Sequence, residues 1–207
     1  MIEGIVMHKF ILFIASGLLA SVCLANEVRV GETLPRVVVE SKGEMVFDYK
    51  IENNRMVSRK GTEITYRTWD SGQLKGKIRC IYHLAARMGI SKINQPFIDA
   101  LIAARLPEFL PDGAFKTTTI LDTSDALWGT ATLAGNKLED SQLDVAHAYY
   151  VNDTKGLARS AWGLPHETST VILLDAEGRV LYHKEGKMSK DEINRAVAMI
   201  RKELAKL

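Results

Sequence analysis

The sequence is poor in cysteine. Of its 207 residues only two are cysteines, Cys23 and Cys80. Cys23 lies in an apolar N-terminal segment, so removal of that segment leaves Cys80 alone and excludes an intramolecular disulfide. Dithiol exchange needs one cysteine that attacks and a second that resolves the mixed disulfide. The sequence therefore predicts no dithiol oxidoreductase activity.

An excess of charge of either sign is also missing. The chain has 27 basic and 25 acidic residues, a formal net charge of +2, and these charges are spread along its length. Nucleic-acid-binding domains concentrate basic residues on one face, so we expect no DNA or RNA partner. The densest basic cluster, Arg55, Arg59 and Lys60, lies among Asn and Gly residues and is interpreted as a solvated turn.

The sequence lacks a metal-ligand pattern and a recognisable nucleophile motif. The histidines beyond the N-terminal segment are His83, His147, His166 and His183, and none has a ligand-like spacing to another. No serine lies in a Gly-x-Ser-x-Gly context. We therefore predict no metal and no cofactor, and the sequence assigns no catalytic residue.

A long apolar run occurs at the N-terminus. His8 and Lys9 precede residues 10–23, and the small residues Cys23 and Ala25 follow with the spacing that a signal peptidase requires. The run is shorter than the ~20 apolar residues that span a bilayer. It predicts a Sec-type signal peptide that is cleaved after Ala25. Retention as an uncleaved anchor and lipidation of Cys23 stay open as alternatives.

Cleavage there divides the chain into a signal peptide (residues 1–25) and a single domain (residues 26–207) with no membrane span. Apolar periodicity in this domain predicts alternating strands and helices. Strands are expected at residues 36–40, 44–51, 63–69, 78–84, 116–121, 146–151, 170–174 and 179–184. Helices are expected at residues 96–106, 132–143 and 157–162, and after a capping box formed by Ser189 and Glu192. This order predicts an α/β fold: a central mixed sheet with helices on both faces and an N-terminal β-hairpin extension formed by residues 44–51 and 63–69.

The segment from Trp69 to Arg87 resembles the TlpA-type thioredoxin stretch, in which Gly76-Lys77 leads into the central strand and Ala85 ends it. Counted from Gly76-Lys77, the two redox cysteine positions of that family fall on Met88 and Ser91.

Over most of its length the chain resembles the YtfJ family of periplasmic proteins. The resemblance rests on residues 117–123, on Ala161-Trp162 and on the Asp-x-x-Gly-Arg-Val hairpin that begins at Asp175. It implies a thioredoxin-like fold and a Gram-negative periplasmic location, and it supplies no catalytic residues. The place of the cis-proline of thioredoxin-like proteins falls on Ser169.

The vacated redox region is the candidate site. Its candidate binding residues are His83, Arg87, Met88, Ser91 and Ser169. The leading hypothesis is a redox-inactive binding or accessory module for a periplasmic protein or peptide.

Two enzymatic alternatives stay open. One is peroxidase-like chemistry of a single cysteine, Cys80, through a sulfenic acid, although its apolar surroundings favour a buried, inert thiol. The other is a hydrolase or metal-assisted enzyme in which His83 acts with Ser91 or Ser169.

Two further groups of side chains have both a functional and a structural interpretation. Trp69, Trp128 and Trp162 could line a groove, but packing is the more common role of such residues. Asp122, with Thr123 and Asp125, could contribute to a pocket, and a turn with a helix cap explains these residues equally well.

Overall fold

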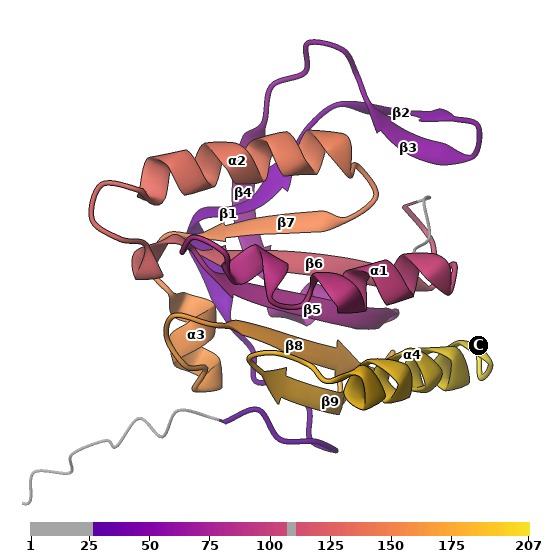
Figure 1. Cartoon of the computed structure of the whole chain (residues 1–207). Helices are drawn as coiled ribbons and strands as arrows, with labels where there is room; N and C mark the ends of the chain where they lie inside the picture. The colour runs from indigo at the N-terminus through magenta and orange to yellow at the C-terminus, as the bar shows by residue number, and fades with distance from the viewer. Residues whose placement is uncertain (1–26, 107–110) are drawn as a thin grey trace, which may run out of the picture.

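The structure, a computed structural model, describes residues 27–106 and 111–207. The predicted signal peptide, its cleavage site and Cys23 lie outside these residues. The main sheet has seven strands in the order β4-β1-β7-β6-β5-β8-β9 (Figure 1). They are β1 (Val38–Val46), β4 (Thr65–Asp70), β5 (Ile78–Ala85), β6 (Phe115–Asp122), β7 (Tyr149–Asp153), β8 (Ser169–Leu174) and β9 (Val180–Glu185). β5, β6 and β7 are parallel and β8 runs antiparallel to β5, so the predicted mixed sheet is confirmed.

Helices pack on both faces of this sheet. The α-helices are α1 (Gln95–Ala103), α2 (Ala131–Asp144), α3 (Leu157–Trp162) and α4 (Lys190–Leu204), and the 3-10 helices are η1 (Ser71–Leu74), η2 (Ile90–Lys92) and η3 (Thr123–Asp125). Side chains of α1, α2 and α4 share one apolar core with Cys80, Tyr82 and Leu84 of β5. Side chains of α3 and η1 share the other core with Ile81. This division follows from β-strand geometry, in which successive side chains point to opposite faces.

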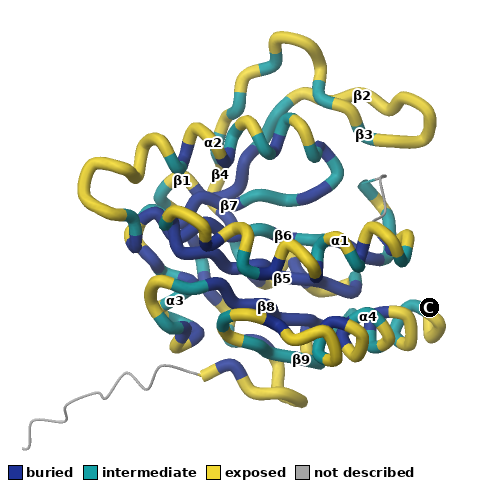
Figure 2. The backbone as a smooth tube through the Cα atoms, in the orientation of Figure 1, coloured by how far each residue is buried: buried dark blue, intermediate teal, exposed yellow. Residues whose placement is uncertain are grey.

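The central strands are buried on both faces. Every residue of β5 and of β8 is buried, and Figure 2 shows these strands in dark blue beneath exposed helix surfaces. Residues 171–174 of β8 form a continuous apolar run, which is typical of strands covered on both sides. In β5, the buried polar residues Arg79 and His83 interrupt the apolar sequence. The candidate site lies at the carboxyl end of β5.

The N-terminal hairpin differs from its prediction. Glu44, Met45 and Val46 pair with β4 as expected, but the predicted strand 44–51 does not continue along β4. Instead β2 (Tyr49–Glu52) and β3 (Arg55–Ser58) form a separate two-stranded hairpin that projects from the domain (Figure 1). Asn53 and Asn54 have φ angles of 48° and 61°, and two consecutive left-handed residues make a tight hairpin turn. Arg55 therefore lies in a strand and not in the predicted solvated turn.

The predicted strand 36–40 also joins residues 44–46 in one strand, β1, through a bulge. Gly43 lies in this bulge with a φ of 82°, and a Cβ atom there would come within 2.3 Å of the Arg67 carbonyl oxygen. Only glycine fits this position without displacing the neighbouring strand.

The helices follow their predictions closely. α3 has the predicted bounds, and the capping box formed by Ser189 and Glu192 is present at the start of α4. α1 ends at Ala103, before the predicted end at Leu106, and Arg105 has a φ of 55°. A left-handed residue cannot continue a right-handed helix, so the chain turns there.

Candidate functional site

Three segments meet at the carboxyl ends of β5 and β6. The Ala86 amide donates to the Asp122 carbonyl oxygen (3.0 Å), which joins the loop after β5 to the end of β6. The Ala85 amide donates to the Thr168 carbonyl oxygen (3.0 Å), which joins β5 to the loop before β8. Residues from all three segments therefore form one site.

Met88 lies on the surface of this site. It occupies the turn between β5 and η2, where the next residue, Gly89, has a φ of 86°. Its relative exposure is 101%, so nothing covers the side chain. Ser91 is also exposed, and its carbonyl oxygen accepts a hydrogen bond from the Tyr82 hydroxyl (3.2 Å).

Ser169, by contrast, is completely buried at the start of β8. Its hydroxyl accepts a hydrogen bond from the Asn94 side-chain amide (3.1 Å). The same amide donates to the Gly186 carbonyl oxygen (2.8 Å), and the Met188 amide donates to the Asn94 side-chain oxygen (2.8 Å). Asn94 thus links three segments of the chain. The Ser169 hydroxyl takes part in this structural hydrogen-bond network. The peptide bond before Ser169 is trans, because the described residues contain no cis peptide bond.

His83 does not face Ser169. His83 pairs with Thr170, whereas Ser169 pairs with Leu84 on the neighbouring strand. Adjacent strand residues point to opposite faces, so His83 lies on the α3 side and Ser169 on the side of α1 and α4. The His–Ser169 arrangement considered for a hydrolase is therefore not formed.

The His83 imidazole is almost fully buried, with a relative exposure of 1%. Its Nε2 atom and the neighbouring Thr170 hydroxyl have no hydrogen-bond partner within the described part of the chain. Burial lowers the pKa of His83 to about 4, although the nearby Asp122 carboxylate opposes the shift. The imidazole is therefore neutral at pH 7.

Asp122, whose carboxylate lies near this imidazole, is the first residue of a network of polar contacts. The fully buried Asp122 carboxylate accepts a hydrogen bond from Arg159 Nε of α3 (2.8 Å). Arg159 Nη1 lies 2.8 Å from His166 Nε2, and His166 Nδ1 lies 3.5 Å from Asp125. Asp122 also accepts from the Ser124 amide and caps η3. The predicted turn and cap are confirmed, and the ion pair with Arg159 is an addition.

Arg87 extends this network to the surface. Its guanidinium contacts Asp125 (3.1 Å) and Glu167 (2.8 Å). Asp125 also accepts a hydrogen bond from the Glu167 amide (2.6 Å). Burial opposes ionisation of Asp125, but the hydrogen bonds from the Glu167 amide and Arg87 outweigh it and lower the pKa of this carboxyl. The Met88 loop, η3 and the loop before β8 are thus held together by charge pairs.

The three tryptophans do not form the groove that was considered. Trp69 and Trp162 are buried and pack edge to face, with ring centroids 6.4 Å apart. Trp128 has a relative exposure of 101%, and its neighbour Leu127 is 55% exposed. Both follow Asp125, so they lie on the loop that Arg87 ties to the Met88 turn. The apolar residues exposed at the site are therefore Met88, Leu127 and Trp128.

Cys80 lies in the core on the side of α1 and α4, as its apolar surroundings predicted. It is the free cysteine of the described residues, and its relative exposure is 1%. Burial raises the pKa of the thiol to about 12, which leaves a negligible fraction of thiolate at pH 7.

Thiol alkylation tests this environment. We expect native protein at pH 7.5 to react with iodoacetamide at Cys80 at least about 100-fold more slowly than protein in 6 M guanidinium, because reaction requires opening of the core. Mass spectrometry of the Cys80 peptide measures both rates. Equal rates in the two conditions would show a reactive thiol and would restore the single-cysteine alternative.

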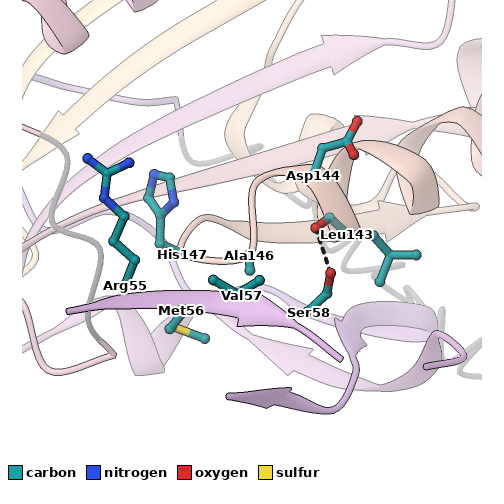
Figure 3. A pocket seen from close by; sticks show the side chains of 8 residues that line it. All are labelled: Arg55, Met56, Val57, Ser58, Leu143, Asp144, Ala146 and His147. Carbon is teal, nitrogen blue, oxygen red and sulfur yellow. Dashed lines mark hydrogen bonds between the residues drawn. The ribbon is translucent and has the colours of Figure 1, made fainter. Parts of the chain in front are cut away.

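A cavity of about 220 Å³ lies elsewhere, between β3 and the turn that joins α2 to β7. Figure 3 shows Arg55 and His147 next to each other on one side of it, and the Ser58 hydroxyl donates to the Leu143 carbonyl oxygen (3.1 Å) on the other. Burial lowers the pKa of His147 to about 4, and the nearby positive charges of Lys116 and Arg55 act in the same direction. This cavity contains none of the predicted site residues.

The described residues contain no group of three or more His, Cys, Asp or Glu side chains that could hold a metal ion. Within the same residues, no helix combines the length and the apolar character needed to cross a membrane.

Comparison with known proteins places the chain in a family. The family described as "Bacterial protein of unknown function (YtfJ_HI0045)" matches residues 28–203. The chain belongs to the YtfJ family. It is 30% identical over 185 residues to the protein YtfJ of Escherichia coli K12, which covers 89% of this chain and 92% of that protein. It is 31% identical over 195 residues to a protein of Haemophilus influenzae, which covers 94% of this chain and 97% of that protein.

Among solved structures, the chain is similar to a Bacteroides thetaiotaomicron protein described as a candidate protein disulfide isomerase. The TM-score is 0.52 at 16% identity, with 86% of this chain and 91% of that chain covered. At this identity the comparison shows the fold alone. The thioredoxin-like fold expected from the resemblance to the YtfJ family is confirmed.

Sequence reasoning missed Asn94 and Arg159 in this member of the family. Asn94 directly precedes α1 and no motif marks it, and Arg159 lies in a short helix with no motif around it. Arg159 meets Asp122, 37 positions away in the sequence, only because α3 packs on the face of the sheet that carries Ile81 and Ile120. Local sequence patterns therefore cannot predict that contact.

Acidification tests the buried His83. Because its pKa is lowered from 6.5 to about 4, the unfolded state binds more protons between these values. Stability is therefore full above pH 6.5 and falls as the pH decreases toward 4, by about 3 kcal/mol at most for this residue. We expect His83→Gln to remove that part of the pH dependence in urea unfolding at pH 7 and pH 4.5. His166→Gln, which removes a histidine whose side chain is 63% exposed, is the control, and an unchanged pH dependence in His83→Gln would contradict the assignment.

Proposed function

We propose that this member of the YtfJ family is a redox-inactive periplasmic module that binds a protein partner presenting an apolar segment. The binding surface is formed by Met88, Leu127 and Trp128 and is called the docking surface below. The observation that carries the proposal is the full exposure of Met88, at the place where the resemblance puts a redox cysteine, together with the full exposure of Trp128.

Exposed large apolar side chains at one site favour a protein contact. Tryptophan is enriched among the residues that dominate binding energy, and methionine adapts its shape to different partners. The contact between Arg87 and Asp125 joins the Met88 turn to the loop that carries Leu127 and Trp128, and exposed apolar side chains at one site mark interaction surfaces. The contact between Arg87 and Asp125 supports the idea of a preorganised surface, because it fixes the two loops relative to each other before binding.

The enzymatic alternatives have less support. Peroxidase-like chemistry at Cys80 requires an accessible thiolate, whereas this thiol is buried with a raised pKa. Hydrolysis by His83 requires a nucleophile on the same face of β5, whereas Ser169 lies on the opposite face. The buried imidazole with its low pKa fits a structural role better than proton transfer to a substrate.

Export is part of the proposal. The N-terminal segment has the charge, apolar run and small residues of a cleaved signal peptide. N-terminal sequencing of the protein from a periplasmic fraction tests this, with a mature chain that begins at Asn26 as the expected result. A mature chain that retains residues 1–25, or begins with lipid-modified Cys23, would replace cleavage after Ala25 by one of its alternatives.

Site-specific photo-crosslinking tests the docking surface. A photoreactive amino acid is placed at Met88, at Trp128 or at the control position Val30, which is 65% exposed and lies outside the site. We expect the same protein adduct from Met88 and Trp128 in living cells, and none from Val30. The partner is then identified by mass spectrometry and purified.

The purified pair gives the quantitative test. Trp128→Ser is expected to weaken binding at least about 30-fold, because a central aromatic anchor contributes 2 kcal/mol or more. The matched control is Ile51→Ser, which removes an exposed apolar residue (49% exposed) from β2 in the projecting hairpin. Adducts that form equally from Val30, or equal affinity of Trp128→Ser and wild type, would refute the proposal.

A further inference from the structure

The methionines of the described residues differ widely in exposure. They are Met45, Met56, Met88, Met188 and Met199. Met45 and Met188 lie in the apolar core with relative exposures of 4% and 3%. Met56 and Met199 are half-buried, and Met88 is 101% exposed. The sulfur chemistry that is accessible at this site therefore belongs to a thioether and not to a thiol.

We propose that Met88 is a peroxide-sensitive oxidation site, and that its oxidation makes the docking surface polar. The peroxide transfers one oxygen atom to the Met88 sulfur and an S=O bond forms as the O–O bond breaks. The sulfur loses two electrons, and the peroxide is reduced to water or, for an alkyl peroxide, to an alcohol. The step needs no proton from the protein, because the hydrogen atoms of the peroxide remain in the water or alcohol that forms. The consequence for binding rests on the proposed function, whereas the oxidation site does not.

The surroundings of Met88 make this oxidation selective and local. Access decides where peroxide attacks sulfur, and Cys80, which is 1% exposed, is shielded together with the core methionines. On either side of Met88 the chain is fixed, since Arg87 pairs with Asp125 and Ile90 is buried. The sulfoxide therefore changes the polarity of one side chain without unfolding the loop that presents it.

Conversion of the thioether to a sulfoxide replaces a flexible apolar group by a polar one. An apolar partner segment would then have to desolvate the S=O group on docking, which costs free energy when no hydrogen bond replaces the lost water. Oxidation at Met88 is thus expected to weaken binding at the docking surface.

Limited oxidation of the folded mature protein tests the site. Protein is treated with hydrogen peroxide, and the sulfoxide content of each methionine peptide is followed by mass spectrometry. Met88 is expected to oxidise at least about tenfold faster than Met45 and Met188, and faster than the half-buried Met56 and Met199. The proposal is overturned if Met56 or Met199 oxidises as fast as Met88.

Retention on a phenyl column tests the change in polarity without any partner. Wild-type protein with Met88 oxidised is expected to elute earlier than untreated protein, while Met88→Leu treated in the same way keeps its retention. Unchanged retention of oxidised wild type would overturn the polarity change. The Trp128 crosslink is then measured before and after peroxide within each variant. Absence of any adduct would count against the proposed function alone, whereas an adduct that is undiminished by Met88 oxidation would refute the effect on binding.

Discussion

Replacement of Asp122 with alanine is expected to lower the free energy of unfolding by about 3–5 kcal/mol. The substitution leaves the Arg159 guanidinium, whose side chain is 19% exposed, without the carboxylate that it contacts at 2.8 Å. It also removes the acceptor of the Ser124 amide at the start of η3. Chemical denaturation monitored by circular dichroism at pH 7 measures the loss.

Asp70 provides a matched control for this prediction. Its carboxylate caps η1 through the Gly72 amide (2.8 Å) and pairs with Arg36 (3.0 Å), so its contacts repeat those of Asp122. The side chains of this pair are 71% and 36% exposed, however, and exposed ion pairs contribute little. Asp70→Ala is expected to lower the free energy of unfolding much less than Asp122→Ala, and mostly through the lost cap. Equal losses in the two variants would show that burial does not decide the strength of the Asp122 contacts.

Trp162→Ala is expected to destabilise the protein by about 3–5 kcal/mol. The indole is 1% exposed, packs against Trp69, and donates from Nε1 to the Pro35 carbonyl oxygen (2.8 Å). Truncation therefore leaves a large cavity under α3 and leaves the Pro35 carbonyl oxygen without its hydrogen-bond donor. The midpoint of urea unfolding reports the loss.

Trp128→Ala is the control for tryptophan content. Because the Trp128 side chain is fully exposed, its removal is expected to change the free energy of unfolding by no more than about 0.5 kcal/mol. Trp162→Phe, which keeps an aromatic ring but loses the hydrogen bond to Pro35, is expected to lie between the two. A loss in Trp128→Ala as large as that in Trp162→Ala would mean that Trp128 is packed in solution, and would also remove the basis of the docking surface.

Local features of the fold were predicted from sequence because they depend on neighbours within one turn or one strand. The bounds of α3, the Ser189 capping box and the burial of Cys80 all followed from short patterns. The order of strands and helices was enough to predict a mixed sheet with helices on both faces, and the resemblance to the YtfJ family added the expectation of a thioredoxin-like fold. The separate hairpin of β2 and β3, which turns at Asn53 and Asn54, was not predicted. Several polar residues between residues 53 and 61 could each have made a turn.

The sequence indicated where the candidate site lies, but it did not predict which side chains meet there. The sequence by itself determined that Met88 follows the predicted strand 78–84, and the resemblance to TlpA-type proteins led us to expect a vacated cysteine position there. Strand register decided that His83 meets Thr170 and not Ser169, and helix packing decided that Arg159 reaches Asp122. Only the tertiary structure separated the exposed Trp128 from the buried Trp69 and Trp162, because exposure depends on which distant segments cover a side chain.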